Sequence, residues 1–98
     1  MTIPNIEYVR ARKPEILQMA EKHGIANIRV FGSVARGDAN ENSDIDFLVE
    51  FTKPTFDNYF YFKEGLEKLF DREVDIVELE NVRNPIRRES MISSIVPL

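Results

Sequence analysis

The sequence reads Gly32-Ser33-Val34-Ala35-Arg36-Gly37-Asp38, continues through a short polar loop, and resumes as Ser43-Asp44-Ile45-Asp46-Phe47-Leu48-Val49. The first part holds a hydroxyl and an arginine between two glycines. The second holds two carboxylates one residue apart at the head of an apolar run. A glycine turn whose backbone N–H groups point outward suits an anion, and carboxylate oxygens suit a hard cation such as Mg²⁺. The pattern therefore predicts a phosphate-binding turn beside a metal-binding pair of aspartates.

The hydrophobic pattern places both features at the ends of strands. Residues 25–31 predict a first strand that runs into Gly32, and residues 44–51 predict a second strand. Alternate apolar residues of the second strand face one way, while Asp44 and Asp46 share the opposite face, about 7 Å apart along the strand. Both carboxylates can therefore reach one cation.

A third strand is expected over residues 73–79, with Asp75 on its polar face. From there Asp75 could supply a third carboxylate to the same site. Three carboxylates fit a two-metal site, in which one ion activates the attacking oxygen and both stabilise the pentavalent centre.

Helices are expected over residues 6–10, 14–22, 56–70 and 85–95. The residues expected to form their apolar faces are Ile16, Leu17 and Ala20 in the second helix, Tyr59, Phe62, Leu66, Leu69 and Phe70 in the third, and Ile86, Ile92 and Ile95 in the last. Gly65, inside the third helix, is expected to mark close packing against the sheet. Three strands separated by helices predict an α/β or α+β sandwich.

The bulk composition indicates one ordinary globular domain over residues 1–98. The formal net charge is −4, which argues against stable nucleic-acid binding. The chain has no cysteine, which excludes disulfides and thiolate metal sites. No apolar run approaches the roughly 20 residues that span a bilayer, so no membrane association is expected and the expected location is the cytoplasm.

The arginines leave alternatives open. Arg36 could counter phosphate charge with its planar fork of donors, or pair at the surface with Asp38 or Glu41. A second cluster consists of Arg83, Arg87 and Arg88. It could contact the nucleotide or an acidic partner, or form a solvated face.

The motif resembles the signature of the minimal nucleotidyltransferases of the DNA polymerase β superfamily. It is most similar to the MNT-type antitoxins that are paired with HEPN toxins in prokaryotic operons. The match reads Gly32-Ser33-x-Ala35-Arg36-Gly37-x(5)-Ser43-Asp44-x-Asp46-x-Leu48-Val49, and it continues in Val74-Asp75-Ile76-Val77. The order and length of the other elements agree, so the resemblance covers nearly the whole chain.

The resemblance implies an α+β nucleotidyltransferase fold with a small mixed sheet of about three or four strands flanked by helices. The nucleotide-binding residues expected from the motif are Gly32, Ser33, Arg36 and Ser43, with the first two on the β- and γ-phosphates of ATP. The residues expected for both catalysis and metal binding are Asp44, Asp46 and Asp75. Asp44 and Asp46 would bind Mg²⁺, with two ions expected in all. Asp75 would complete the site and assist deprotonation of the acceptor hydroxyl.

The reaction implied is transfer of AMP from ATP, with release of pyrophosphate, to a tyrosine hydroxyl of a partner HEPN RNase toxin that is thereby silenced. At this length we expect no second domain that encloses an acceptor, which favours an acceptor presented by a partner. Two alternatives stay open: neutralisation of the toxin by binding alone, and nucleotidyl transfer to a small molecule such as an aminoglycoside.

Overall fold

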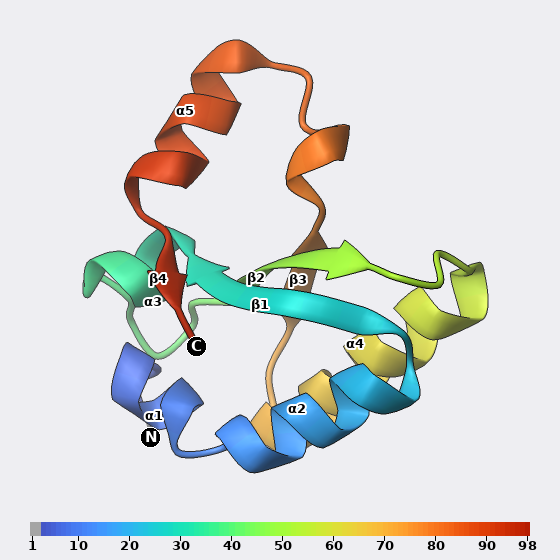
Figure 1. The fold of residues 1–98 in the computed structure, drawn as a ribbon. Coiled ribbons are helices and arrows are strands. Elements are labelled where there is room, and N and C mark those ends of the chain that lie inside the picture. Colours follow the sequence, from blue (N-terminus) through green and yellow to red (C-terminus); the bar gives the residue numbers. More distant parts are fainter. Residues whose placement is uncertain (1–2) are drawn as a thin grey trace.

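A computed structural model describes residues 3–98 of the chain. A four-stranded sheet in the order β3-β2-β1-β4 forms its centre. The strands are β1 (Ile25–Phe31), β2 (Ile45–Phe51), β3 (Val74–Val77) and β4 (Val96–Pro97). β1 is antiparallel to β2 and β4, while β2 and β3 are parallel, so the sheet is mixed (Figure 1). This confirms the predicted α+β fold with a small mixed sheet.

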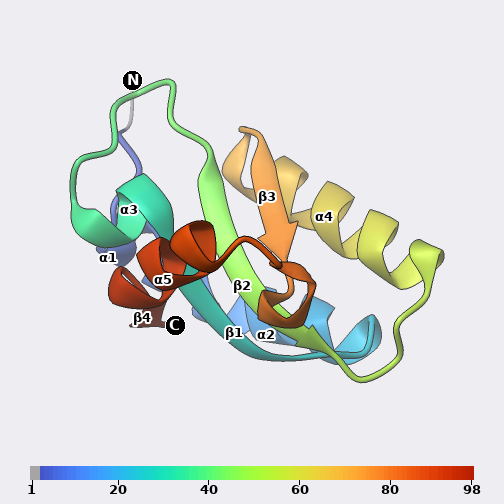
Figure 2. The ribbon, with the colours of Figure 1, turned by 90° about the horizontal axis from the view of Figure 1, so that it is seen from above.

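The helices lie on both faces of the sheet. They are α1 (Ile6–Arg10), α2 (Lys13–Lys22), α3 (Gly32–Arg36), α4 (Phe56–Phe70) and α5 (Pro85–Ser93), with a 3-10 turn η1 (Leu79–Asn81). Helices α1, α2 and α4 cover one face, and α5 stands over the other (Figure 1). Seen from above, α5 lies beside α3 and crosses over β1 (Figure 2). The end of β1 and the start of α3 therefore lie under α5.

Two apolar clusters hold these layers together. The larger one joins the sheet to α1, α2 and α4 and contains the fully buried Phe47 and Phe62. The smaller one lies under α5 and consists of Phe31, Leu48, Val82 and Met91. Leu48 therefore faces α5 while its neighbours in β2 face the other helices. This is the alternation expected from the sequence, and it leaves Asp46 on the α5 side.

Local signals set most element boundaries. The Thr55 hydroxyl accepts a hydrogen bond of 3.1 Å from the Asn58 backbone N–H and caps α4. Gly24 follows α2 with a φ of +67°, a left-handed conformation that favours glycine at a helix end. Within residues 3–98, no helix is long and apolar enough to cross a membrane.

The apolar-face predictions were wrong at three exposed residues. Leu17 is 46% exposed, Ile86 80% and Ile92 50%. Helix α5 is instead anchored by Met91, which is 4% exposed. A short helix turns only a narrow stripe towards the sheet, and the position of α5 over β1 selects Met91 for that stripe.

Two packing details are set by contacts between elements. Ile25 joins the same cluster as Ile28 and Val30, because a bulge between Ala26 and Arg29 shifts the alternation of β1 by one residue. Gly65 faces α2 rather than the sheet, since a Cβ at that position would lie 2.7 Å from the sulfur of Met19.

The ends of several elements also differ from the predicted ones. β3 is shorter than predicted, and η1 follows it. β2 begins at Ile45 rather than at Asp44, and α5 ends at Ser93 rather than at residue 95.

Candidate active site

Asp46 lies where three strands meet. In the register of the sheet it stands opposite Phe31 of β1 on one side and opposite Asp75 of β3 on the other. Asp44 immediately precedes β2, and it is exposed. The fold thus brings the three predicted carboxylates to one edge of the sheet, although Asp75 is distant from the other two in sequence.

Gly32 connects β1 to α3 and lies against the Asp46 carboxyl. Its φ is +75°, in the left-handed region, and a Cβ on Gly32 would overlap the Oδ2 atom of Asp46. Both the backbone conformation and the space therefore require glycine here. The predicted phosphate turn and the predicted aspartate pair are in direct contact at this point.

The remaining predicted nucleotide-binding residues are already held by the polypeptide. The Nε of Arg36 forms a 3.2 Å ion pair with Asp38, the surface pairing that the sequence left open. The Ser43 hydroxyl accepts a 2.9 Å hydrogen bond from the Asn40 backbone N–H and stabilises the loop before β2. Ser33 lies in the first turn of α3 and is half-buried.

The charge in the site is strongly negative. Burial, followed by the neighbouring carboxylates of Asp75 and Asp44, raises the pKa of Asp46 from 3.8 to about 6, against the opposing effects of Arg36 and Arg87. The part of the shift that comes from Asp75 and Asp44 shows that their negative charges act on the Asp46 carboxyl. Such a site favours a bound cation.

The donor set fits a divalent ion that also takes oxygens from its substrate. Across residues 3–98, no group of three or more acidic, histidine or cysteine side chains is placed to hold a metal ion by itself. Mg²⁺ usually binds through one or two carboxylates and completes its shell with water and substrate phosphates. Asp46 and Asp75, as neighbours in the sheet, suit that arrangement with Asp44 at its edge.

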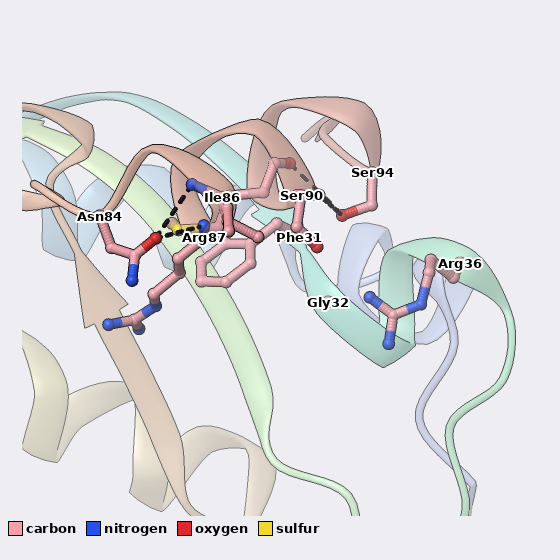
Figure 3. A pocket seen from close by; sticks show the side chains of 9 residues that line it. Phe31, Gly32, Arg36, Asn84, Ile86, Arg87, Ser90 and Ser94 are labelled. Atoms are coloured by element: carbon pink, nitrogen blue, oxygen red, sulfur yellow. Dashed lines mark hydrogen bonds between the residues drawn. The ribbon is translucent and has the colours of Figure 1, made fainter.

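A cavity of about 470 Å³ opens between the start of α3 and helix α5 (Figure 3). Its lining residues are Phe31, Gly32, Arg36, Asn84, Ile86, Arg87, Ser90, Met91 and Ser94. It has cationic, polar and apolar walls, as a nucleotide site requires. The α5 residues were not assigned to the site from the sequence, apart from the open question of Arg87, because only the folded chain places α5 over Gly32.

The structure separates the three arginines of the C-terminal cluster. Arg87 lines the cavity. Arg88 instead donates a 2.7 Å hydrogen bond to the Leu79 carbonyl and fixes α5 to η1. Arg83 is exposed and lies outside the cavity lining.

The sequence of the chain matches a known family. The sequence pattern of the family described as "Nucleotidyltransferase domain" matches residues 14–96. The chain belongs to this family. It is therefore a nucleotidyltransferase, as the motif predicted.

Two relatives align with nearly the whole length of the chain. "Protein adenylyltransferase MntA" of Thermococcus cleftensis is 36% identical over 90 residues, which is 90% of this chain and 88% of the relative. "Putative protein adenylyltransferase MJ1379" of Methanocaldococcus jannaschii is 33% identical over 98 residues, with 97% and 96% covered.

Solved structures confirm the fold. A structure described as a "putative minimal nucleotidyltransferase" is 40% identical, covers 96% of each chain and has a TM-score of 0.79. A chain of a toxin–antitoxin crystal structure with AMP-PNP is 20% identical, with 87% of this chain and 70% of that chain covered and a TM-score of 0.69. A chain of the complex between tri-AMPylated Shewanella oneidensis HEPN toxin and MNT antitoxin is 16% identical, with 90% and 69% covered and a TM-score of 0.64.

Proposed function

We propose that the chain transfers AMP from ATP to a tyrosine hydroxyl of a partner HEPN RNase toxin and acts as its antitoxin. The observation that carries the proposal is the pairing of Asp46 with Asp75 across parallel strands, with Gly32 seated against the Asp46 carboxyl. This arrangement sets a carboxylate pair beside a phosphate turn, which is what nucleotidyl transfer requires.

The proposed roles follow the positions of the side chains. Gly32 and Ser33 bind the β- and γ-phosphates at the turn into α3, where the absence of a side chain on Gly32 lets the backbone approach closely. Asp44 and Asp46 hold Mg²⁺. Asp75, opposite Asp46 in the sheet, completes the site and accepts the proton of the acceptor hydroxyl.

Arg36 and Ser43 complete the proposed nucleotide site. Arg36 already lines the cavity, and it counters phosphate charge from the α3 side. Ser43 acts from the loop before β2, whose conformation its hydroxyl stabilises.

The reaction forms one bond and breaks one bond. The acceptor oxygen bonds to the α-phosphorus of ATP, the bond from that phosphorus to the bridging oxygen breaks, and pyrophosphate leaves with the electron pair. The hydroxyl proton passes to a carboxylate of the site. Mg²⁺, with two ions proposed, would supply charge stabilisation for the attacking and leaving oxygens when bound.

The choice of a protein acceptor rests on the relatives. The Thermococcus relative is named a protein adenylyltransferase, and related folds occur in complexes of HEPN toxin with MNT antitoxin. A tyrosine hydroxyl suits the chemistry because its pKa near 10 makes it easier to deprotonate than a serine or threonine hydroxyl.

The experiment compares catalysis with occlusion. The wild-type protein and an Asp44→Asn/Asp46→Asn double variant are incubated with the HEPN partner, ATP and Mg²⁺, and the RNase activity of the partner is then measured. We expect silencing by the wild type only, with an added AMP mass on a tyrosine-containing peptide. If the double variant silences the partner equally well, binding alone is the mechanism.

A further inference from the structure

We propose that Arg87 of helix α5 binds the β- and γ-phosphates of the nucleotide, opposite Arg36, and so selects a triphosphate over a monophosphate. The inference rests on the proposed function and adds a binding residue that the nucleotidyltransferase motif does not contain. Its basis is the placement of two guanidinium groups around one cavity.

Arg36 and Arg87 approach the cavity from different elements. Both are among its lining residues, and so is Gly32. Figure 3 shows the two arginines on opposite sides of Gly32, with Arg36 projecting from α3 and Arg87 from α5. Both positive charges are close enough to act on the Asp46 carboxyl. A phosphate chain held at Gly32 would therefore lie between two cations.

The guanidinium of Arg87 is available for a ligand. Within residues 3–98 it makes no hydrogen bond and no ion pair with another side chain or carbonyl. Its neighbour Arg88 is used by the fold, through the hydrogen bond to Leu79. Arg36 is partly used, through Asp38.

The position of Arg87 is unfavourable for a cation without an anionic ligand. Arg87 lies in the first turn of α5, where the helix dipole repels positive charge, and that turn contains no acidic residue. The Asn84 side chain fixes this turn by accepting hydrogen bonds from the backbone N–H groups of Ile86 (2.9 Å) and Arg87 (3.2 Å). The start of α5 therefore holds Arg87 at the cavity edge, where bound phosphate would compensate both its charge and the dipole.

The charge balance of the loaded site also calls for both arginines. The negative charge of three carboxylates and a triphosphate exceeds the positive charge of two divalent ions by about three elementary charges. Two guanidinium groups reduce that excess to about one. The planar guanidinium group of arginine, with its fork of N–H donors, matches the oxygens of a phosphate better than the compact ammonium group of lysine does.

The test measures binding without turnover. Calorimetry on the full chain with Mg²⁺ compares α,β-methylene ATP, which cannot donate AMP, with AMP itself. For Arg87→Ala we expect the dissociation constant of the ATP analogue to rise about 10- to 100-fold and that of AMP to change less than about twofold. Arg87→Lys should recover part of the loss. Arg83→Ala, at an arginine before α5 that does not line the cavity, is the matched control and should bind like the wild type.

Each result has one meaning. Equal binding of the ATP analogue by wild type and Arg87→Ala overturns the inference about Arg87 alone, as does an equal weakening for AMP. Failure of the wild type to bind the ATP analogue overturns the proposed function instead. Thermal unfolding of each variant checks the fold. If Arg87→Ala unfolds at a lower temperature than the wild type, Arg87→Lys takes its place in the comparison. An Arg87→Lys variant that folds normally and binds the ATP analogue as tightly as the wild type would contradict phosphate recognition by the guanidinium group.

Discussion

Gly32 shows most clearly how a single residue restricts the geometry of the site. Its left-handed φ excludes ordinary side chains, and the Asp46 carboxyl occupies the space of a Cβ. We expect Gly32→Ala to displace Asp46 and to lower adenylyl transfer at least about 100-fold. The strain of a left-handed alanine should also cost roughly 1–2 kcal/mol of stability. Transfer assays and denaturant unfolding check both effects.

Gly37 provides the matched control for that prediction. Its φ is +82°, but a Cβ there would meet no atom within 4 Å. Gly37→Ala should therefore lose a similar amount of stability without the same loss of transfer. Equal transfer rates for the two alanine variants would show that the Gly32–Asp46 contact does not matter.

Through Asp46, the stability of the folded chain is expected to fall as the pH rises. Burial and the neighbouring carboxylates raise its pKa to about 6 in the folded chain, against 3.8 in the reference state. The folded protein binds this proton more tightly, so the ionised carboxyl destabilises it above pH 6, and the penalty fades as the pH falls from 6 towards 3.8. Asp46→Asn should therefore melt at a higher temperature than the wild type at pH 8 in chelator, with a smaller gain near pH 4.

Asp38 is the control for this comparison, because it is exposed and paired only with Arg36. Asp38→Asn should show no comparable stabilisation at pH 8. A lower melting temperature for Asp46→Asn at pH 8 would contradict the account of uncompensated charge in the site.

The other two carboxylates are expected to separate binding from chemistry. Asp75→Asn should lose transfer and largely keep affinity for a non-reactive ATP analogue, because the turn at Gly32 still holds the phosphates. Asp44→Asn should weaken both transfer and Mg²⁺-dependent binding. Calorimetry and transfer rates on the two variants check the difference, and an equal loss of affinity for both would make Asp75 mainly a nucleotide-binding residue.

At the residue level, the sequence was informative where side-chain chemistry is local. The alternation of the second strand predicted that Asp46 and Leu48 face away from its other apolar residues, and the structure confirms this for Leu48, which lies under α5. The contact between Gly32 and Asp46 was not predictable, because it depends on how β1 pairs with β2.

Among the elements, α5 carries the largest part of the site that the sequence did not reveal. Its apolar side was predicted at Ile86, Ile92 and Ile95, but the buried residue of the helix is Met91. Ile95, just beyond the end of the helix, is half-buried and packs against the same cluster as Met91. In a helix of nine residues, few positions face the core, and the docking angle decides which ones do. The two-residue strand β4 has too short a pattern to be recognised from sequence, yet its pairing with β1 fixes the chain that follows α5.

The anchoring of α5 can be tested directly. Met91→Ala should cost about 2–3 kcal/mol, because it removes a buried side chain packed near Phe31 and Leu48. It should also weaken binding of the ATP analogue, since α5 forms one wall of the cavity. Ile92→Ala, at a half-exposed position of the same helix, should cost less than about 1 kcal/mol. Denaturant unfolding and calorimetry measure both, and equal losses of stability for the two variants would contradict this anchoring.

In the whole molecule, three strands and two helix starts meet at one edge of the sheet. β2 contributes Asp46, β3 contributes Asp75, and β1 leads into Gly32. Helix α5 lies beside α3 and over β1 (Figure 2), and its residues line the adjacent cavity. The order of elements predicted this sheet and its main helices well, because their periodicities are long and regular. The cavity depends on contacts between elements, which periodicity does not encode.

The central claim is that the site at this edge of the sheet transfers AMP from ATP to a partner protein. The most direct measurement incubates the protein, Mg²⁺ and the HEPN partner with ATP labelled on either the α- or the γ-phosphate. The account predicts that the α-label becomes covalently attached to the partner, that the γ-label is released in pyrophosphate, and that the Asp44→Asn/Asp46→Asn variant transfers neither. Attachment of the γ-label, or of the α-label by the double variant, would contradict it.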